Sequence, residues 1–212
     1  MKNVYVFSGL GADERVFKYL DFSGFNITFI KWQQPNTEPL NIYASRLLHQ
    51  IVSPKPILIG LSFGGMVAIE IAKHIDTEIV ILIASAKTKN EIPFYYRLAG
   101  RLKLHKLLST GALRRTNFLT NWLFGTKSNK ENGLLQEILK DTDPIFLNWA
   151  IDQVVRWKNK EYKGNVFHIH GTSDRILPIR FVKCNMEIKN GGHFLTINKA
   201  EEVTKILKDI II

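Results

Sequence analysis

Residues 54–75, PKPILIGLSFGGMVAIEIAKHI, carry the local pattern that decides the fold. An apolar run at 57–59 ends in GLSFGG (60–65), and an apolar, Ala-containing segment follows. A continuous apolar run is typical of a strand covered on both faces of a parallel sheet, and the following segment has the composition of a buried helix. The stretch therefore predicts a strand, a sharp turn at Ser62 and a helix.

Short runs rich in β-branched and aromatic residues recur along the chain, separated by segments of helical length. The predicted strands are 4–7, 27–32, 57–61, 79–83, 166–170 and 186–188. Helices are predicted at 15–20, 40–52, 64–75, 93–108, 113–124, 134–139, 145–157 and 201–211. Alternating strands and helices favour an α/β class: a doubly wound, mostly parallel sheet of about six strands with right-handed crossovers.

The segment 87–158 contains no convincing strand and is predicted to be largely helical. It would interrupt the sheet after the fourth strand. A chain of 212 residues is long enough for one well-buried domain. We therefore expect a single domain, 1–212, with 87–158 as a helical cap segment within it.

The positive charge of the chain is concentrated in this segment. The formal net charge is +10, and between Lys87 and Glu131 ten Lys or Arg residues stand against two Glu, which accounts for +8. A basic segment can bind nucleic acid, but it can equally be a solvated helix face. We expect the second and predict no nucleic-acid partner.

Cysteine content and hydropathy indicate the compartment. The one cysteine, Cys184, rules out an internal disulfide framework and is typical of a reducing environment. The N-terminal apolar run is short and lacks a convincing signal-peptide cleavage context. No apolar run approaches the roughly 20 residues that span a bilayer. The sequence predicts a cytoplasmic protein without a membrane span.

Polar residues with complementary chemistry follow several predicted strands. Ser62 follows the third strand, Asp174 the fifth and His193 the sixth. Carboxyl ends of parallel strands share one edge, where ligands bind. A serine hydroxyl becomes nucleophilic when an imidazole removes its proton and a carboxylate orients that imidazole. The three residues are therefore candidates for nucleophile, base and acid.

Backbone amides that could stabilise an oxyanion are also predicted at this edge. One belongs to Phe63, directly after the candidate nucleophile. The other belongs to Leu10 in the loop after the first strand, where Gly9 and Gly11 permit an inward-pointing N–H group. Glycines around Ser62 leave room for a sharp strand-to-helix turn.

Four stretches together resemble the α/β-hydrolase family: SGLGADERVF (8–17), GLSFGG (60–65), HGTSDRILP (170–178) and GGHF (191–194). The resemblance runs from about residue 3 to the end of the chain. It implies that Ser62 is the nucleophile, Asp174 the acid and His193 the base of a serine hydrolase acting on a carboxylic ester or thioester. It implies no cofactor and no metal.

The chain departs from this family in three ways. The oxyanion loop begins Ser8-Gly9, whereas the family has His-Gly, but the donors are backbone amides, so we expect function to survive. The family's first two strands have no counterpart. Only 19 positions separate Asp174 from His193, so the helix of that crossover should have one or two turns.

Other histidines and acids compete for the same roles. His49, His74 and His105 lie in helical or basic segments and are expected at the surface. His168 and His170 belong to the fifth strand, where His170 could line the site structurally. The remaining rival is a cap acid, Asp152, which does not follow a strand.

Two other kinds of site are disfavoured. The spacing Gly9-x-Gly11 could begin a dinucleotide fingerprint, but Glu14 occupies the third glycine position and would oppose a pyrophosphate. The phosphate-binding motif G-x(4)-G-K-S/T does not occur. His168 and His170 point the same way from a strand, yet no third metal ligand is evident.

The cap should shape the substrate pocket, because it is expected to lie over the strand ends. Its aromatic residues are Phe94, Tyr95, Tyr96, Phe118, Trp122, Phe124, Phe146 and Trp149. An apolar pocket with a cationic rim, including Arg114 and Arg115, suits a small acyl ester or thioester that is anionic or carried by an anionic partner. Two alternatives remain: a lyase or synthase that uses the triad for proton abstraction on a carboxylated substrate, and a non-enzymatic binding protein.

Overall fold

A parallel sheet forms the centre of the computed structural model, which describes residues 1–107, 111, 114 and 117–211. Six strands pair in the order β2-β1-β3-β4-β5-β6, all parallel. The strands are β1 (Lys2–Phe7), β2 (Phe25–Phe29), β3 (Ile57–Leu61), β4 (Ile79–Ile83), β5 (Val166–Gly171) and β6 (Met186–Ile188). The predicted α/β class, parallel pairing and strand number are confirmed. Every residue of β3 and β4 is buried, as continuous apolar strands require.

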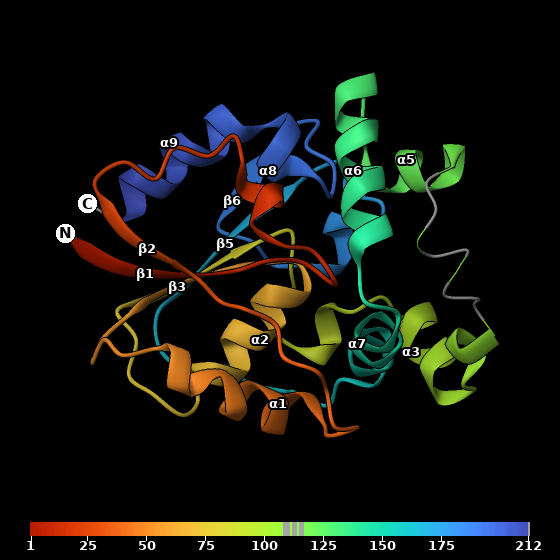
Figure 1. Ribbon diagram of the computed structural model, residues 1–212, viewed down its shortest axis with the longest axis horizontal. Helices are drawn as coiled ribbons and strands as arrows, with labels where there is room; N and C mark the ends of the chain where they lie inside the picture. The colour runs from red at the N-terminus through yellow and green to blue at the C-terminus, as the bar shows by residue number, and fades with distance from the viewer. Residues whose placement is uncertain (108–110, 112–113, 115–116, 212) are drawn as a thin grey trace.

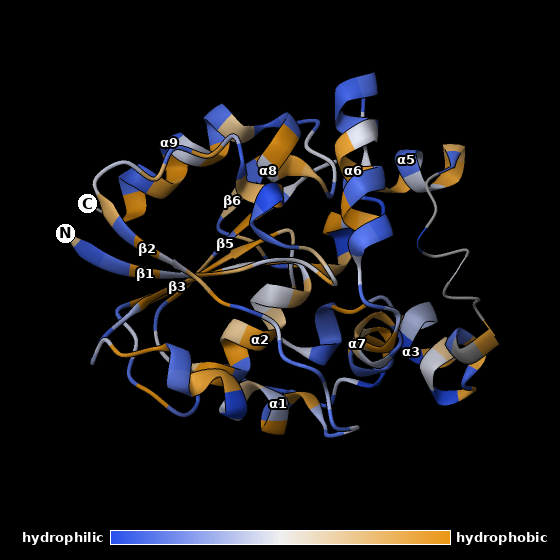
Figure 2. Ribbon diagram, in the orientation of Figure 1, coloured by the Kyte–Doolittle hydropathy of each residue, from blue (hydrophilic) through white to orange (hydrophobic). Residues whose placement is uncertain are grey.

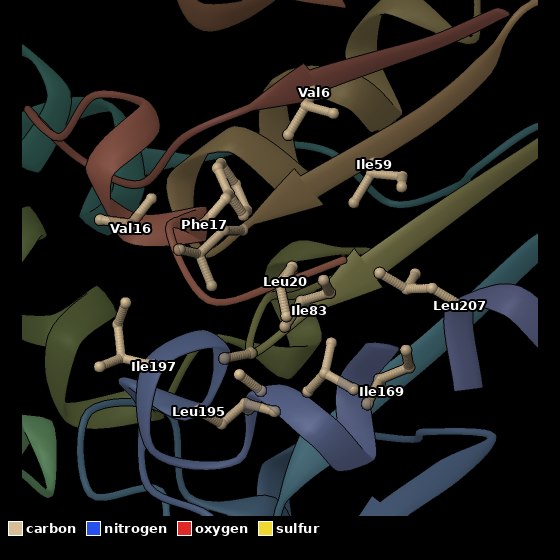
Figure 3. Close-up of a cluster of buried hydrophobic side chains, with 14 of the residues drawn as sticks. Val6, Val16, Phe17, Leu20, Ile59, Ile83, Ile169, Leu195, Ile197 and Leu207 are labelled. Atoms are coloured by element: carbon tan, nitrogen blue, oxygen red, sulfur yellow. The ribbon is translucent and has the colours of Figure 1, made fainter. Parts of the chain in front are cut away.

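Helices cover both faces of the sheet (Figure 1). One face is covered by α1 (Leu40–Leu47) and α2 (Phe63–Ile71), and the other by α8 (Leu195–Asn198) and α9 (Ala200–Ile211). Successive residues of β1, β3 and β4 pack alternately into two apolar clusters on opposite faces of the sheet, the period that a pleated strand imposes. The cluster on the α9 side joins strand residues such as Ile59 and Ile169 to Leu207 (Figure 3).

The helical insertion follows β4 and lies near the end of the sheet at which the strands finish (Figure 1). Among the described residues, its helices include α3 (Phe94–Arg101), α5 (Phe118–Phe124), α6 (Asn129–Asp141) and α7 (Pro144–Arg156). Side chains at their starts fix the last three: Asn117, Ser128 and Asp143 each accept a hydrogen bond from an amide in the first turn. The predicted helical insertion after the fourth strand is confirmed. Part of the predicted helix 113–124 lies outside the described residues.

Several helices differ in length from their sequence-based predictions. The segment 15–20 forms only a 3-10 turn, η1 (Glu14–Phe17), which the side chain of Asp13 caps. The helix expected at 134–139 is α6, which starts earlier because Ser128 caps it. Four more 3-10 turns are η2 (Leu48–Gln50), η3 (Lys89–Glu91), η4 (Leu104–Leu107) and η5 (Ile179–Phe181). The single turn η5 is all the helix that the short crossover from β5 to β6 contains.

The C-terminal helix α9 is amphipathic and packs its apolar side against the sheet. Buried residues of α9 recur every three or four positions at Ala200, Val203, Leu207 and Ile211. Figure 2 shows that hydrophobic and hydrophilic residues alternate along this helix. The strand order places a topological switch point between β1 and β3, where loops leave toward opposite faces.

Candidate active site

The switch point is occupied by the turn at Ser62, which joins β3 to α2. The backbone of Ser62 has φ 52° and ψ −120°, a region that residues other than glycine rarely adopt. Neighbouring groups hold it there: the Ser62 amide donates to the carbonyl of Ile83 at 2.9 Å, and Ser85 Oγ donates to the Ser62 carbonyl at 2.6 Å. The turn therefore projects the Ser62 side chain from a strained but hydrogen-bonded backbone.

Glycines are required around this turn because the backbone approaches itself closely. A Cβ atom on Gly64 would lie 2.2 Å from the carbonyl oxygen of Ser8 and 2.5 Å from that of Phe7. A Cβ atom on Gly60 would lie 2.4 Å from the Cα atom of Gly65. Neither position has room for a side chain. Because both residues are glycine, the loop after β1 can lie directly against the start of α2.

His193 lies between Ser62 and Asp174. Its Nε2 atom is 2.9 Å from Ser62 Oγ, and its Nδ1 atom is 2.7 Å from Asp174 Oδ2. An ionised carboxylate only accepts hydrogen bonds, so Nδ1 carries the proton and Nε2 presents a lone pair to the serine hydroxyl. The structure thus brings together three residues separated by up to 131 positions in the sequence.

The carboxylate of Asp174 is buried and fully hydrogen-bonded. Its Oδ1 atom accepts from the amides of Ile176 at 2.9 Å and Leu177 at 2.8 Å, while Oδ2 faces His193. Burial by itself would raise the pKa of Asp174, but the charge and hydrogen bond of His193, the charge of His170 and the Leu177 amide outweigh it. The pKa of Asp174 is therefore below its ordinary value of 3.8, and the group is anionic at neutral pH.

Two backbone amides near Ser62 are free to bind an anion. Phe63 begins α2, and Leu10 lies in the loop after β1. Within the described residues, neither amide donates a hydrogen bond to a protein group. The Cβ position of Gly9 is 3.8 Å from Ser62 Cβ, so this loop passes directly beside the serine. Leu10 and Phe63 are the two residues that the sequence proposed as oxyanion donors.

Solved structures align with the whole chain at low sequence identity. A hydrolase from Oleispira antarctica aligns with a TM-score of 0.73 and 14% identity, covering 100% of this chain and 91% of its own. An esterase from Exiguobacterium antarcticum gives 0.71 and 14%, with coverage of 99% and 91%. A protein assigned to the alpha/beta hydrolase family from Desulfitobacterium hafniense gives 0.67 and 15%, with coverage of 100% and 96%. The chain has the α/β-hydrolase fold. Family models and curated protein sequences give no match to it.

Within this fold, sequence reasoning missed residues that support the site. Ser85 follows β4 and orients the Ser62 backbone, and a strand-end search extended to β4 would have found it. The ring of Phe124 in the helical insertion packs edge-on against the ring of His193, with centroids 5.8 Å apart. Phe124 was predicted only as a cap aromatic, because no local pattern links it to His193.

His170 has the structural position that the sequence suggested. Its Nε2 atom donates to the carbonyl of Leu177 at 2.8 Å, and so ties β5 to the loop that wraps the Asp174 carboxylate. Its Nδ1 atom is 3.2 Å from Nε2 of His168, which is also fully buried. Burial lowers the pKa of both histidines. No group of three or more potential metal ligands occurs among the described residues.

The rival residues lie away from Ser62, with one error in prediction. His49 and His74 are exposed, as expected. The prediction for His105 is wrong: its side chain is only 6% exposed, because it packs beside α7 and bonds to Asp152 at 2.9 Å. Asp152 contacts His105 and Arg156.

Arg115 lies outside the described residues. None of the helices among those described combines the length and apolar character that crossing a membrane requires.

Proposed function

We propose that this protein is a serine hydrolase that cleaves a carboxylic ester or thioester through an acyl-enzyme intermediate. The observation that carries the proposal is the unbroken hydrogen-bonded path from Ser62 Oγ through His193 to the buried Asp174 carboxylate. The strained backbone of Ser62 supports it further, because such strain persists where it has a functional use. The α/β-hydrolase fold is compatible with this chemistry but does not by itself specify it.

In the first half of the reaction, Ser62 Oγ attacks the carbonyl carbon of the substrate. His193 Nε2 takes the hydroxyl proton as the Oγ–C bond forms, and the carbonyl electron pair moves onto its oxygen. When the tetrahedral intermediate collapses, His193 returns that proton to the departing alcohol or thiol. Asp174 stays ionised and stabilises the imidazolium that forms between these two transfers.

In the second half, water replaces the leaving group. His193 Nε2 removes a proton from the water, whose oxygen attacks the acyl carbon, and then protonates Ser62 Oγ as the acid product leaves. The amides of Leu10 and Phe63 would bind the oxyanion in both halves. Loss of one donor of this kind typically lowers the rate by about 10²–10³.

The charge and exposed aromatic residues of the helical insertion favour an anionic substrate or carrier. Phe94 and Phe118 are 61% and 85% exposed, and Trp122 is 46% exposed. Of the other cap aromatics, Phe146 and Trp149 are buried against α2 and do not form a rim. Exposed rings beside basic residues suit an amphipathic partner that carries negative charge, and long-range attraction would speed its encounter with the site.

Labelling with a fluorophosphonate probe tests the nucleophile directly. The folded wild-type protein should form a covalent adduct at Ser62, detected by mass spectrometry, and Ser62→Ala should not. His49→Phe, at an exposed histidine outside the site, should label normally. A folded wild-type protein that resists the probe would refute the proposal. A panel of p-nitrophenyl esters then separates a hydrolase from a lyase, which would ignore simple esters.

A further inference from the structure

An apolar cavity of about 420 Å³ lies where the loop after β1 meets the helical insertion. It is lined by Leu10, Tyr96, Ala99, Leu104, His105, Ile151, Val154 and Val155. These residues come from that loop, α3, η4 and α7, and Figure 1 shows α3 beside α7. Among these described residues, only Tyr96 and His105 have polar side-chain atoms, so an apolar group would suit most of the space.

Two residues connect this cavity to the candidate active site. Leu10 is one of the residues that line the cavity, and its backbone amide is a candidate oxyanion donor. Tyr96 lies close enough to Asp174 for their charges to interact: burial raises the pKa of Tyr96 to about 12, with further contributions from Tyr95 and Asp174. A substrate carbonyl at the oxyanion amides would therefore lie next to the cavity.

His105 is a polar residue in this otherwise largely apolar wall. Its side chain is 6% exposed, and its Nε2 atom lies 2.9 Å from Asp152 Oδ1. Arg156 Nη1 also contacts the Asp152 carboxylate, at 3.2 Å. Because the carboxylate accepts, Nε2 of His105 donates, and in the neutral ring Nδ1 is left with a lone pair.

Nδ1 of His105 is buried and has no hydrogen-bond partner among the described residues. A buried polar atom without a partner lowers stability, and a ligand that supplies the missing bond recovers that free energy. The group that would do so must be a hydrogen-bond donor, since Nδ1 can only accept in this tautomer. A hydroxyl group is the simplest donor that an otherwise apolar chain can carry.

We propose that this cavity binds the acyl chain of the substrate and that His105, oriented by Asp152, accepts a hydrogen bond from a hydroxyl group on that chain. The preferred substrate class is then a hydroxyacyl ester or thioester. This inference rests on the proposed serine-hydrolase function, because it assigns the acyl side of the same site. A carboxylate on the chain is disfavoured, since the negative charge of Asp152 lies directly behind the His105 ring.

Matched ester pairs test the inference. We would measure kcat/KM for p-nitrophenyl octanoate and for p-nitrophenyl octanoates that carry one hydroxyl at successive chain positions. In the wild-type protein, at least one hydroxylated isomer should exceed the plain ester by about 2- to 10-fold, the range expected of one neutral hydrogen bond. Among plain esters, each added methylene that enters the cavity should raise kcat/KM about fourfold until the cavity is full.

Variants at His105 assign the preference to this residue. His105→Phe should abolish the preference for the hydroxylated isomer, whereas His105→Asn retains an acceptor oxygen and should keep part of it. His49→Phe changes an exposed histidine and should leave the preference as in the wild type. Each result is a ratio of two substrates within one variant, so it does not depend on the fraction of folded protein.

Some outcomes would overturn the inference while leaving the hydrolase proposal intact. These are hydrolysis of plain esters with no gain from a hydroxyl at any position, a preference for a terminal carboxylate, or a hydroxyl preference that survives in His105→Phe. Absence of both Ser62 labelling and ester hydrolysis in the folded protein would instead refute the hydrolase proposal itself.

Discussion

The carboxyl edge of the sheet buries polar side chains, whereas the helical insertion above it exposes large apolar ones. At the edge, Asp174 and His193 are 4% and 5% exposed, and hydrogen bonds of 2.7 and 2.9 Å join them to Ser62. In the insertion, large apolar side chains such as Leu107 and Phe118 are 82% and 85% exposed. The edge is held by strands on both sides, whereas the outer helices of the insertion lack a covering layer among the described residues.

The two regions should therefore tolerate substitutions to different degrees. Groups that react must be held within fractions of an ångström, and strand ends in a packed sheet provide that rigidity. Groups that recognise a substrate can differ without loss of the reaction, so they occur in segments that are less constrained. Changes at the edge should therefore have large effects on reaction rate or stability, and changes in the insertion should alter selectivity and encounter.

The largest effect is expected from Asp174→Asn. The variant keeps the side-chain shape, but its amide can donate to His193 and stabilise the wrong tautomer of the ring. We expect kcat to fall by about 10⁴. Steady-state kinetics on a p-nitrophenyl ester, with circular dichroism to check folding, would measure this. A loss of less than tenfold would mean that Asp174 does not orient the base.

The next largest effect is expected on stability, from a single added methyl group. Gly64→Ala would place Cβ 2.2 Å from the Ser8 carbonyl oxygen, so the free energy of unfolding should fall by about 1–3 kcal/mol or more. The matched control is Gly133→Ala in α6, where a Cβ atom meets nothing within 4 Å. There stability should rise by about 0.5–1 kcal/mol, because alanine favours helix. Equal effects in urea denaturation would contradict the close approach at Gly64.

A smaller effect is expected from pH, through the buried pair His168 and His170. Burial lowers the pKa of His168 well below 6.5, and the charges of His170 and Lys87 lower it further. The unfolded chain then binds more protons below pH 6.5 than the folded protein does. Stability should consequently fall as pH decreases below 6.5, by at most about 1.4 kcal/mol per pH unit for each histidine.

Urea denaturation at pH 7.5, 6.5 and 5.5 would measure this slope. His168→Asn should make it shallower, whereas His74→Asn, at an exposed histidine, should leave it unchanged. Asp174 does not contribute in this window, since its lowered pKa affects stability only below about 3.8. Identical slopes in the wild type and His168→Asn would contradict the assignment.

The smallest effect should come from charge on the insertion. The double change Arg101→Gln and Lys103→Gln removes two exposed positive charges from the basic segment. For an anionic ester, kcat/KM should fall by about two- to fivefold at low salt, and the difference should shrink as salt is added. A neutral ester of equal chain length should be unaffected. An anionic ester that responds to neither salt nor the double change would show that the charge is only solvated.

The sequence predicted that Ser62, Asp174 and His193 lie at one edge because each strand of a parallel sheet can be recognised from its own local sequence. Strand runs such as 57–61 are recognisable locally, and whatever follows a strand in a parallel sheet must lie at the same edge. That rule by itself makes Ser62, Asp174 and His193 candidates for one site, because each of them follows a predicted strand. The same rule applied after β4 points to Ser85, whose hydroxyl donates to the Ser62 carbonyl.

In the insertion, the sequence determined only that helices form. A helical period shows that one face is buried but not which element covers it, since that depends on helix packing between segments distant in the sequence. Hence the sequence predicted His105 at the surface, whereas helix packing buries its side chain beside Asp152, 47 positions away, at an apolar cavity. The parallel sheet makes the candidate reacting groups recognisable from the sequence. The packing of the helices above it, which no local pattern encodes, decided what surrounds them.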